Sequence, residues 1–414
     1  MYSAISSCRI CGNKNLVKVL DLGNQTLTGV FPSHEKEEIT CGPLQLVKCI
    51  GDEHCCGLLQ LAHSFDLEEM YGDNYGYRSG LNPGMVKHLH AKVARILNFV
   101  DLSDGPIVLD IGSNDGTTLA AYPENNCTRV GMDPTSEKFR EYYPENVKVI
   151  SDFFSASRFN EEFPGRKARV VTSFSMFYDL EKPMDFVREV ASILDVRGIW
   201  VFEQSYMPLM LERNSYDTVC HEHLEYYSLR QIEWMLSRCN LKIVDVEFND
   251  VNGGSFSVTA ARVESDYSVS ADIQRILKRE ASEGLDGLEP YISFAKRAEE
   301  SRTDLCDFVS QMRGMGKRVA FLGASTKGNV VLQYCCFKAG DGLVVGEVNA
   351  DKFGKLTPGT LLPIVNEREL LLDEPDYLIV LPWHFREFMV KKYNLKKSKL
   401  VFPLPKLEVV NIND

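Results

Sequence analysis

The sequence predicts an α/β protein built around a doubly wound, mostly parallel sheet, and three observations support this. First, the apolar segment from Val108 to Ile111 runs directly into a loop with Gly112 and Gly116, as a buried strand does before a helix. Second, strand-like segments alternate with helical segments between residues 105 and 262, which is typical of a parallel sheet with crossover helices. Third, a further α/β pattern begins at residue 317.

Composition and charge narrow the class of protein. A chain of 414 residues is long enough for two or three domains. Its formal net charge of −12, without a basic patch in the sequence, argues against a nucleic-acid partner. The first residues, 1–4, lack the basic and apolar regions of a signal peptide, and no run of 18 apolar residues predicts a membrane span. We therefore expect a cytoplasmic protein with no membrane association.

The N-terminal segment, up to about residue 70, holds half of the cysteines, which in a chain without a signal peptide favours reduced thiols or a metal. Two pairs of thiolates joined by a loop can bind Zn²⁺ tetrahedrally and leave no open position. We predict a structural zinc site with four ligands: Cys8, Cys11, Cys49 and Cys56. Competing ligands are Cys55, Cys41 and His54, and the alternative is that these thiols are small buried side chains.

A linker rich in Tyr, Gly and Asn follows over residues 71–82. It is interpreted either as a plain loop or as a lid whose phenol groups reach an active site. Apolar residues then recur at helical spacing over residues 85–99, which predicts a helix with one buried face.

Seven segments of the next region are expected to be strands: 107–110, 129–133, 147–151, 168–173, 198–204, 241–248 and 255–261. Helices are expected between most of them, such as 117–122, 184–194 and 229–239. The last two strands are separated by Gly253 and Gly254, so we expect an antiparallel strand at the edge of the sheet.

The loop after the first of these strands indicates a nucleotide-type cofactor, and the second strand ends with Asp133, an acid placed to accept both ribose hydroxyls. The loop has acids where a dinucleotide fingerprint has glycines, and carboxylates repel a pyrophosphate but attract a cation. S-adenosylmethionine (SAM) carries a sulfonium and an ammonium group. We therefore predict a SAM site, with NAD or FAD or an ordinary turn as alternatives. Its residues are expected to be Asp110, Gly112, Ser113, Asn114, Asp115, Gly116, Asp133 and, for the adenine, Asp152 and Phe153.

The sequence His221-Glu222-His223 follows a predicted strand end and can face the same cleft. Two His residues at i and i+2 diverge on a helix, so a metal site of the H-E-x-x-H type is disfavoured. Because a His titrates near neutral pH and a neighbouring Glu can orient it, we predict proton abstraction here. Packing histidines at the start of a polar helix are the alternative. A base beside SAM suggests C-methylation of a carbon next to a carbonyl, and O-methylation stays open.

The C-terminal part begins with charged, helical sequence over residues 265–315 and continues with strands near 317–322, 343–349 and 376–383. The loop after the first of these strands leads into a helix that carries Lys327 and Asn329, an arrangement that suits a phosphate. An ordinary strand-to-helix turn is the alternative.

Taken together and in this order, these motifs resemble the nucleotide-sugar C-methyltransferases that make branched deoxysugars. The resemblance covers nearly the whole chain. Its segments are the Cys8/Cys11 pair, Cys56–Leu61, Tyr77–Gly80, the glycine loop, His221–Leu224, Asn252–Ser255, Ser325–Asn329, and Thr357–Thr360 with Pro363 and Ile364.

The resemblance implies three domains: a zinc-binding domain over residues 1–72, a class I SAM-methyltransferase core with a Rossmann-like fold over 73–263, and a Rossmann-like domain over 264–414 that helps to hold the nucleotide sugar. It implies a 4-keto sugar that is deprotonated next to the ketone and methylated at that carbon. By position, Glu222 and His223 match the family's acid and proposed base, and Tyr77, or alternatively Tyr75, matches its linker tyrosine.

The remaining site predictions follow from the same motifs. His221 is expected to join the catalytic group, and substrate-binding residues are expected to be Tyr75, Arg78, Asn252, Lys327 and Asn329. The chain departs from the characterised branch of the family at two positions, with Cys220 in place of a Tyr and Asp179 in place of a His. The sugar, the nucleotide, the methylated carbon and the choice between monomer and homodimer therefore stay open. The rival functions are an NAD-dependent sugar oxidoreductase or epimerase and a zinc-bearing sugar-nucleotide binding protein without catalysis.

Overall fold

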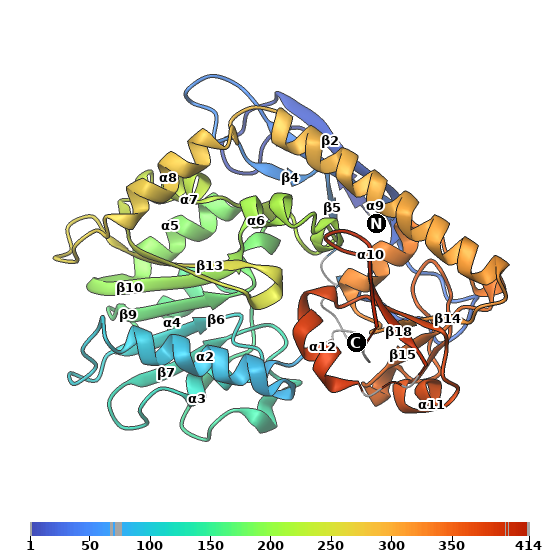
Figure 1. Ribbon diagram of the computed structural model, residues 1–414. Helices are drawn as coiled ribbons and strands as arrows, with labels where there is room; N and C mark the ends of the chain where they lie inside the picture. Colours follow the sequence, from blue (N-terminus) through green and yellow to red (C-terminus); the bar gives the residue numbers. More distant parts are fainter. Residues whose placement is uncertain (1, 67–68, 71–76, 394, 396, 412–414) are drawn as a thin grey trace.

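The computed structural model describes residues 2–66, 69–70, 77–393, 395 and 397–411. An N-terminal group of strands lies above two α/β units, one centred on β10 and the other on β14 (Figure 1). The helix α9, Glu289–Gly314, spans the upper edge between the two units and packs on β2, Leu16–Thr26.

The core unit is a seven-stranded sheet in the order β12-β13-β10-β9-β6-β7-β8. Its strands are β6 Ile107–Ile111, β7 Thr128–Met132, β8 Lys148–Ile150, β9 Ala168–Phe174, β10 Leu194–Ser205, β12 Leu241–Asn249 and β13 Ser255–Arg262. The five strands from β10 to β8 run parallel, and β13 pairs antiparallel with both β10 and β12. The seven predicted strands are thus confirmed, as is the antiparallel hairpin at the edge.

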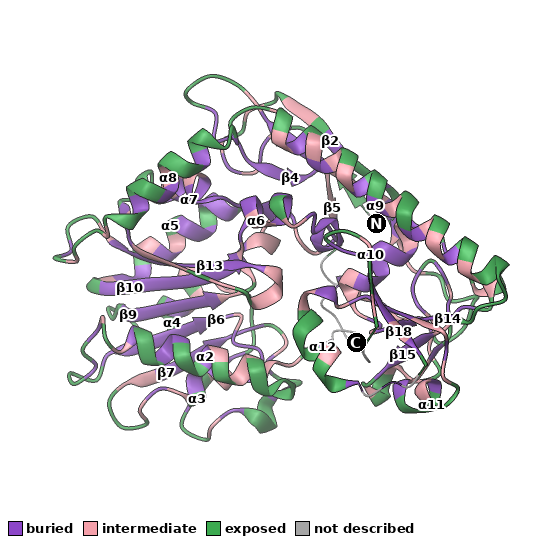
Figure 2. Ribbon diagram, in the orientation of Figure 1, coloured by how far each residue is buried: buried purple, intermediate pink, exposed green. Residues whose placement is uncertain are grey.

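Helices cover both faces of this sheet, because its central strands are apolar on both sides. On one face, buried residues of α2 and α3 pack on Val108, Val170 and Val201. On the other, α4, α5 and α7 pack on the opposite side chains of the same strands, such as Leu109 and Trp200. The bounds are α2 Pro83–Ile96, α3 Thr117–Ala120, α4 Ala156–Glu162, α5 Pro183–Ile193 and α7 Leu229–Ser237. Figure 2 shows the resulting buried layer along the strands.

The N-terminal strands form a four-stranded sheet in the order β11-β4-β3-β2, which the sequence analysis did not predict. Here β3 is Cys41–Cys49, β4 is Leu59–Leu61 and β11 is Glu225–Tyr226. The strand β11 lies in sequence between β10 and β12 of the core unit, so this sheet joins the N-terminal strands to that unit. A separate pair contains β1, Tyr2–Ala4, and β5, His63–Phe65.

The C-terminal unit is a six-stranded sheet in the order β16-β15-β14-β17-β18-β19, parallel except for β19. The strands are β14 Val319–Leu322, β15 Val345–Glu347, β16 Ile364–Asn366, β17 Tyr377–Val380, β18 Lys399–Phe402 and β19 Glu408–Val410. Its helices are α10 Thr326–Tyr334, α11 Glu367–Leu372 and α12 Arg386–Lys392, while α6 Met207–Glu212 and α8 Asp272–Ser282 precede α9. The predicted second α/β unit is confirmed.

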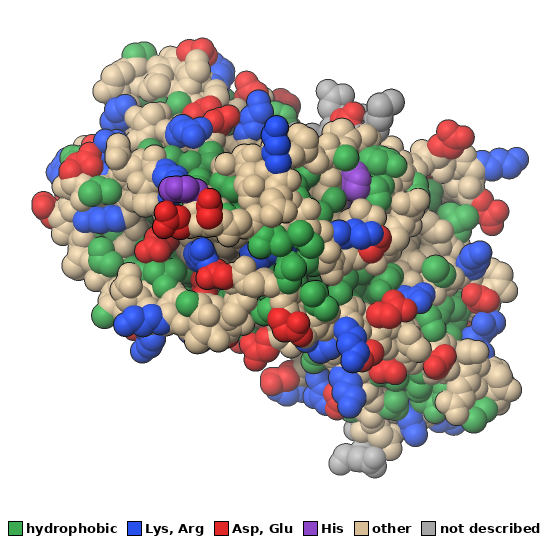
Figure 3. Space-filling view, turned by 90° about the horizontal axis from the view of Figure 1, so that it is seen from above, with side chains coloured by type: hydrophobic (Ala, Val, Ile, Leu, Met, Phe, Trp, Pro, Cys, Tyr) green, Lys and Arg blue, Asp and Glu red, His purple; other side chains and the backbone are tan. Residues whose placement is uncertain are grey.

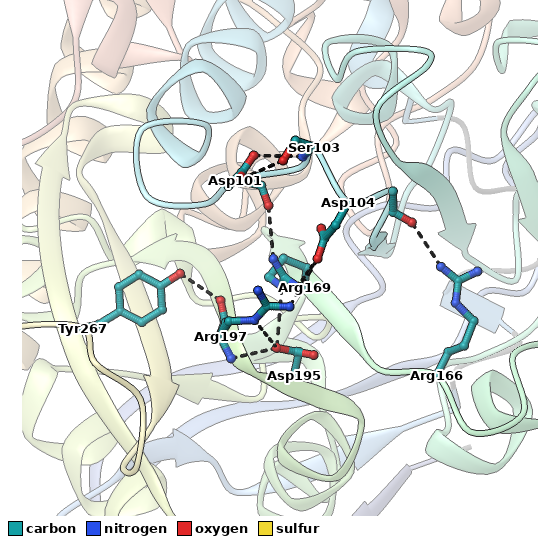
Figure 4. Close-up of polar contacts among 9 residues, drawn as sticks. Asp101, Ser103, Asp104, Arg166, Arg169, Asp195, Arg197 and Tyr267 are labelled. Carbon is teal, nitrogen blue, oxygen red and sulfur yellow. Dashed lines mark hydrogen bonds and ion pairs between the residues drawn. The ribbon is translucent and has the colours of Figure 1, made fainter.

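A polar network closes the end of the core sheet where β9 begins (Figure 4). The nearly buried Arg169 donates to the Asp101 carbonyl at 3.2 Å and to the Asp104 carboxylate at 3.1 Å. Arg197 also donates to Asp104, and Tyr267 donates to the Arg197 carbonyl. At the amino end of the sheet, these polar side chains therefore pair with one another. In a doubly wound sheet, ligands bind at the opposite edge, at the carboxyl ends of the strands.

The exterior mixes charges of both signs. From above, acidic and basic side chains are interspersed with small hydrophobic areas (Figure 3). Within the described part of the chain, no helix is both long enough and apolar enough to cross a membrane.

Candidate active site

A cavity opens at the carboxyl ends of β6, β7 and β9, where a doubly wound sheet binds ligands. The loops after these three strands contribute Gly112, Ser113, Asn114, Asp133, Ser175 and Met176 to its wall. Gly112 has a φ of +70°, and a Cβ atom there would approach the Met176 Cγ to 3.1 Å. A side chain at Gly112 would therefore enter the cavity, so the glycine keeps space for a ligand.

The cavity wall is acidic. Among the described residues that line it there is no Lys or Arg, whereas Asp110, Asp133, Asp179 and Glu181 are present. Burial raises the pKa of Asp110 to about 7. A hydrogen bond from the Thr172 hydroxyl favours the anion and lowers this pKa, but its effect is smaller than that of burial. Such a wall attracts the cationic sulfonium and ammonium groups of SAM and repels a pyrophosphate, so the donor set fits SAM.

Asp133 ends β7 and is held in place by its neighbours. One carboxylate oxygen accepts from the Asn114 amide at 2.9 Å, and the other accepts from the Thr135 amide and hydroxyl, each at 2.6 Å. A carboxylate has about four acceptor sites, so this orientation leaves acceptor capacity toward the cavity. Asp133 thus lies where the ribose of an adenosine would be bound in this fold.

The predicted adenine residues lie at the cavity edge. Phe153 lines the cavity and is 59% exposed, which leaves an aromatic face for a planar base. Asp152 is exposed, does not line the cavity, and accepts from the Phe153 amide at 2.8 Å.

The rest of the glycine loop holds the linker in place. Asn114 accepts from the Ser79 amide at 2.9 Å and donates to the Tyr77 carbonyl at 3.1 Å. Asp115 accepts from the Gly80 amide at 2.8 Å and from the Thr117 hydroxyl at 2.6 Å.

Asp115 is not among the residues that line the cavity, so its carboxylate fixes the linker. Gly116, with a φ of +76°, turns the chain beside the Tyr143 ring, whose hydroxyl bonds to Ser113. Sequence reasoning missed Tyr143, which also donates to the Asn114 carbonyl at 2.8 Å.

The described part of the linker meets the cavity through Tyr77. Tyr77 is 50% exposed, so its side chain is available to a ligand. The Arg78 guanidinium lies 3.7 Å from the Tyr142 ring centroid and 3.9 Å from Asp115, outside the cavity wall. Tyr75 lies outside the described residues.

The predicted zinc ligands are confirmed as a cluster. The sulfur atoms of Cys8, Cys11, Cys49 and Cys56 all lie within 4.8 Å of one another. Four thiolates at this spacing suit a tetrahedral zinc ion with no open position, so the metal's role is structural. The competing ligands stay outside the cluster: Cys55 lies 3.3 Å from Cys49, and Cys41 and His54 are exposed.

His223 lies in the segment before β11. Its Nδ1 is 2.9 Å from the Thr218 carbonyl, which only accepts, so Nδ1 carries the hydrogen and Nε2 keeps a lone pair. Burial and the nearby positive charge of Lys327 lower the pKa of His223 to about 4. The hydrogen bond to the Thr218 carbonyl raises this pKa but does not offset them. The Tyr178 ring packs edge-on against His223 at 4.5 Å. His223 is not among the residues that line the cofactor cavity; it lines a separate small pocket with Tyr178 and Thr218, and Tyr178 directly precedes the cavity residue Asp179.

The other two residues of the motif face different surroundings. Burial raises the pKa of Glu222, whose Oε1 lies 2.8 Å from where a Cβ of Gly29 would stand. His221 is 0% exposed and packs against Phe65 of β5 with ring centroids 4.5 Å apart. The structure therefore places His221 in the contact with the N-terminal domain, away from the cavity.

The C-terminal domain reaches the His223 segment through Lys327. Its ammonium donates to the Asn252 carbonyl at 2.7 Å, and its charge also opposes the burial-driven rise in the pKa of Asp217. Trp383, which sequence reasoning missed, donates to Asp217 at 2.9 Å.

Asn329 is buried and donates to the Thr28 carbonyl at 2.8 Å, so it joins two domains. The loop before α10 donates its Ala324 amide to the Glu347 carboxylate at 2.9 Å, so this amide is already occupied, and phosphate binding by Lys327 stays a prediction. Of the two departures from the family pattern, Asp179 lines the cavity and Cys220 is buried.

Three family models match successive parts of the chain. One described as "Putative zinc binding domain" matches residues 8–71, one described as "Methyltransferase domain" matches 85–246, and one described as "C-methyltransferase C-terminal domain" matches 250–405. Among curated proteins, C-methyltransferase NovU of Streptomyces niveus is 28% identical over an alignment of 414 positions, which covers 98% of this chain and 97% of that relative.

Two solved structures are also similar. Magnesium protoporphyrin IX methyltransferase ChlM of Synechocystis PCC 6803 has 13% identity, a TM-score of 0.34, and coverage of 47% of this chain and 89% of its own. Mitomycin 7-O-methyltransferase MmcR has 13% identity, a TM-score of 0.34, and coverage of 44% and 55%. The three matched domain models, the Cys cluster and the acidic cavity together support a C-methyltransferase with a SAM-methyltransferase fold and an N-terminal zinc-binding domain.

Proposed function

We propose that this C-methyltransferase acts on a nucleotide-linked 4-keto sugar, which it deprotonates next to the ketone and methylates at that carbon. The observation that carries the proposal is the state of His223. Its Nδ1 donates to the Thr218 carbonyl, and burial together with Lys327 keeps the ring neutral. The Nε2 lone pair is therefore available at neutral pH to take a proton from carbon.

The cofactor side of the reaction belongs to the acidic cavity. Asp133 would bind the ribose hydroxyls, and Phe153 would stack on the adenine. When bound, SAM supplies a methyl group on a sulfonium that a carbanionic carbon can attack. The carboxylates of Asp110, Asp179 and Glu181 favour this cation.

The residues proposed to act on the substrate are Glu222, Lys327 and the half-exposed Tyr77. Deprotonation next to a ketone places negative charge on the ketone oxygen, and donors aimed at that oxygen lower the barrier. Burial raises the pKa of Glu222, which favours a carboxyl that donates a hydrogen bond to this oxygen. Lys327 adds a positive charge for the enolate or for the diphosphate of the nucleotide.

The test is exchange of the sugar α-hydrogen with deuterated solvent. The variant His223→Asn is expected to lose both exchange and methylation by about 10²- to 10⁴-fold, the contribution of a general base. The variant His221→Leu is the matched control, because this residue lies away from the cavity and should leave exchange intact. If exchange persists in the His223 variant, the base is another residue.

The cofactor and the substrate class are checked separately. Calorimetric titration should show binding of SAM and none of NAD. A panel of 4-keto nucleotide sugars with different nucleotides should then give a methylated product by mass spectrometry, while matched 4-hydroxy sugars give none. Methylation of the hydroxy sugars would point to an O-methyltransferase and refute the proposal.

A further inference from the structure

Arg9 stands between the zinc ligands Cys8 and Cys11, and its side chain is only 3% exposed. Its guanidinium donates to the Leu61 carbonyl at 2.7 Å, and to the His63 carbonyl and the Ser64 hydroxyl at 3.1 and 2.9 Å. These bonds fix the zinc-binding turn to β4 and β5.

The same guanidinium faces two carboxylates of the methyltransferase core. Arg9 Nε lies 3.5 Å from Glu181, which lines the cofactor cavity, and 3.8 Å from Glu225, which begins β11. Glu225 is 2% exposed, and burial raises its pKa strongly, an effect that Arg9 opposes. Arg9 is the one cation paired with Glu225 among the ion pairs of the described residues.

Backbone pairing continues this connection to the catalytic segment. Glu225 pairs with Gln60 of β4, and the Leu61 amide donates to the Leu224 carbonyl at 2.9 Å. The Leu224 amide in turn donates to the Tyr178 carbonyl at 2.8 Å. Leu224 directly follows His223, and Tyr178 directly precedes Asp179, so both the base segment and the cavity wall are bound to this strand pair.

A second attachment lies at the other turn of the zinc cluster. Gln231 of α7 donates to the carbonyls of Cys56 and Gly57 at 3.0 and 3.2 Å, and the buried Lys48 ammonium donates to the same Gly57 carbonyl. The turn that presents the fourth thiolate is therefore anchored to the core, so the zinc-binding turns have little freedom to move alone.

We infer that Arg9 is a positioning residue that couples the zinc-binding turn to the active site, holding the His223 segment and the Glu181 wall in place. The inference rests on the proposed role of His223. Without Arg9, the buried Glu225 carboxyl would lie unpaired between two domains, and the β4–β11 pair would lose its side-chain support. The zinc-binding domain thus acts on catalysis as well as on stability.

The test compares Arg9→Gln with Arg169→Gln in the full zinc-loaded chain. Arg169 is a matched control, because it is 6% exposed and hydrogen-bonded at the opposite end of the core sheet. For Arg9→Gln we expect zinc to be retained, amide hydrogen exchange over residues 219–227 to be about tenfold faster, and kcat to fall about 10²-fold, as for a misplaced catalytic group. KM for SAM should change far less. Arg169→Gln should leave exchange in that segment and kcat unchanged.

A second variant covers the case in which Arg9→Gln loses zinc. Glu225→Gln removes the core partner and leaves every contact within the zinc-binding turn. It should reproduce the faster exchange and the lower kcat with zinc bound. Wild-type exchange and wild-type kcat in Glu225→Gln would overturn the inference. Hydrogen exchange needs no substrate, so this readout tests the coupling even if the 4-keto sugar proposal fails, which the His223 deuterium experiment decides separately.

Discussion

His221 and His223 are two residues apart, and the structure places them in different surroundings. His221 is fully buried against Phe65, and burial lowers its pKa from 6.5 to about 4, against weaker opposing effects of the Gly42 and Gln25 carbonyls. The unfolded chain therefore binds a proton at His221 at a higher pH than the folded chain does. Its contribution to stability is present above pH 6.5 and is lost as the pH falls toward 4.

The magnitude follows from the two pKa values. Each unit of difference is worth about 1.4 kcal/mol, so lowering the pH from 8 to 5 should remove about 2 kcal/mol of unfolding free energy through His221 alone. In the variant His221→Leu the side chain cannot titrate. The free energy of unfolding of this variant should fall by about 2 kcal/mol less than that of the wild type over the same range.

The assay is urea unfolding at pH 8 and pH 5 with zinc in excess, followed by tryptophan fluorescence. Proton competition for the zinc thiolates affects both proteins, so the difference between them isolates His221. Equal pH dependence in wild type and variant would refute the reasoning, because it would mean that His221 is solvated or protonated in the fold. A loss of deuterium exchange into the substrate in this variant would contradict its assignment away from the cavity.

Three further predictions follow from single contacts. Cys8→Ser should release the zinc and lower the melting temperature, whereas the exposed Cys41→Ser should do neither; metal analysis and a thermal melt check both. Asp133→Asn should weaken SAM binding by about tenfold or more in calorimetry, since it loses a charged acceptor for hydroxyl donors, and unchanged affinity would place the ribose elsewhere. Glu280→Ala should cost about 3 kcal/mol in urea unfolding, because this buried carboxylate accepts from the Tyr206 hydroxyl and from the first amides of α7.

The sequence predicts the core sheet well because its signals are local. The strands β6, β9 and β10 each contain an apolar run followed by turn residues, and each of these runs is long enough to be recognised without its neighbours. The zinc site is also local, since pairs of cysteines at short spacing need only a turn to bring their thiolates together. Neither inference required knowledge of which distant segments meet.

The structure adds the contacts between segments that are far apart in the sequence. The strands β4 and β11 have only three and two residues, too few for any periodicity; β11 pairs with β4, and β4 pairs with β3 as well. The C-x2-C motif gives no sign of a partner for Arg9; this partner is the Glu225 carboxylate of β11. The sequence predicts that Asp115 binds the cofactor, whereas in the structure its carboxylate accepts from the Gly80 amide of the linker. In each case the partner is more than thirty residues away.

These long-range contacts explain why a catalytic segment of the core depends on both flanking domains. On one side, Arg9 of the zinc-binding domain faces the buried Glu225. On the other, Trp383 of the C-terminal domain donates to Asp217, whose pKa burial raises and whose charge Lys327 favours. An isolated core would expose the segment between these two acids without either partner. The geometry around His223 therefore depends on contacts from both flanking domains.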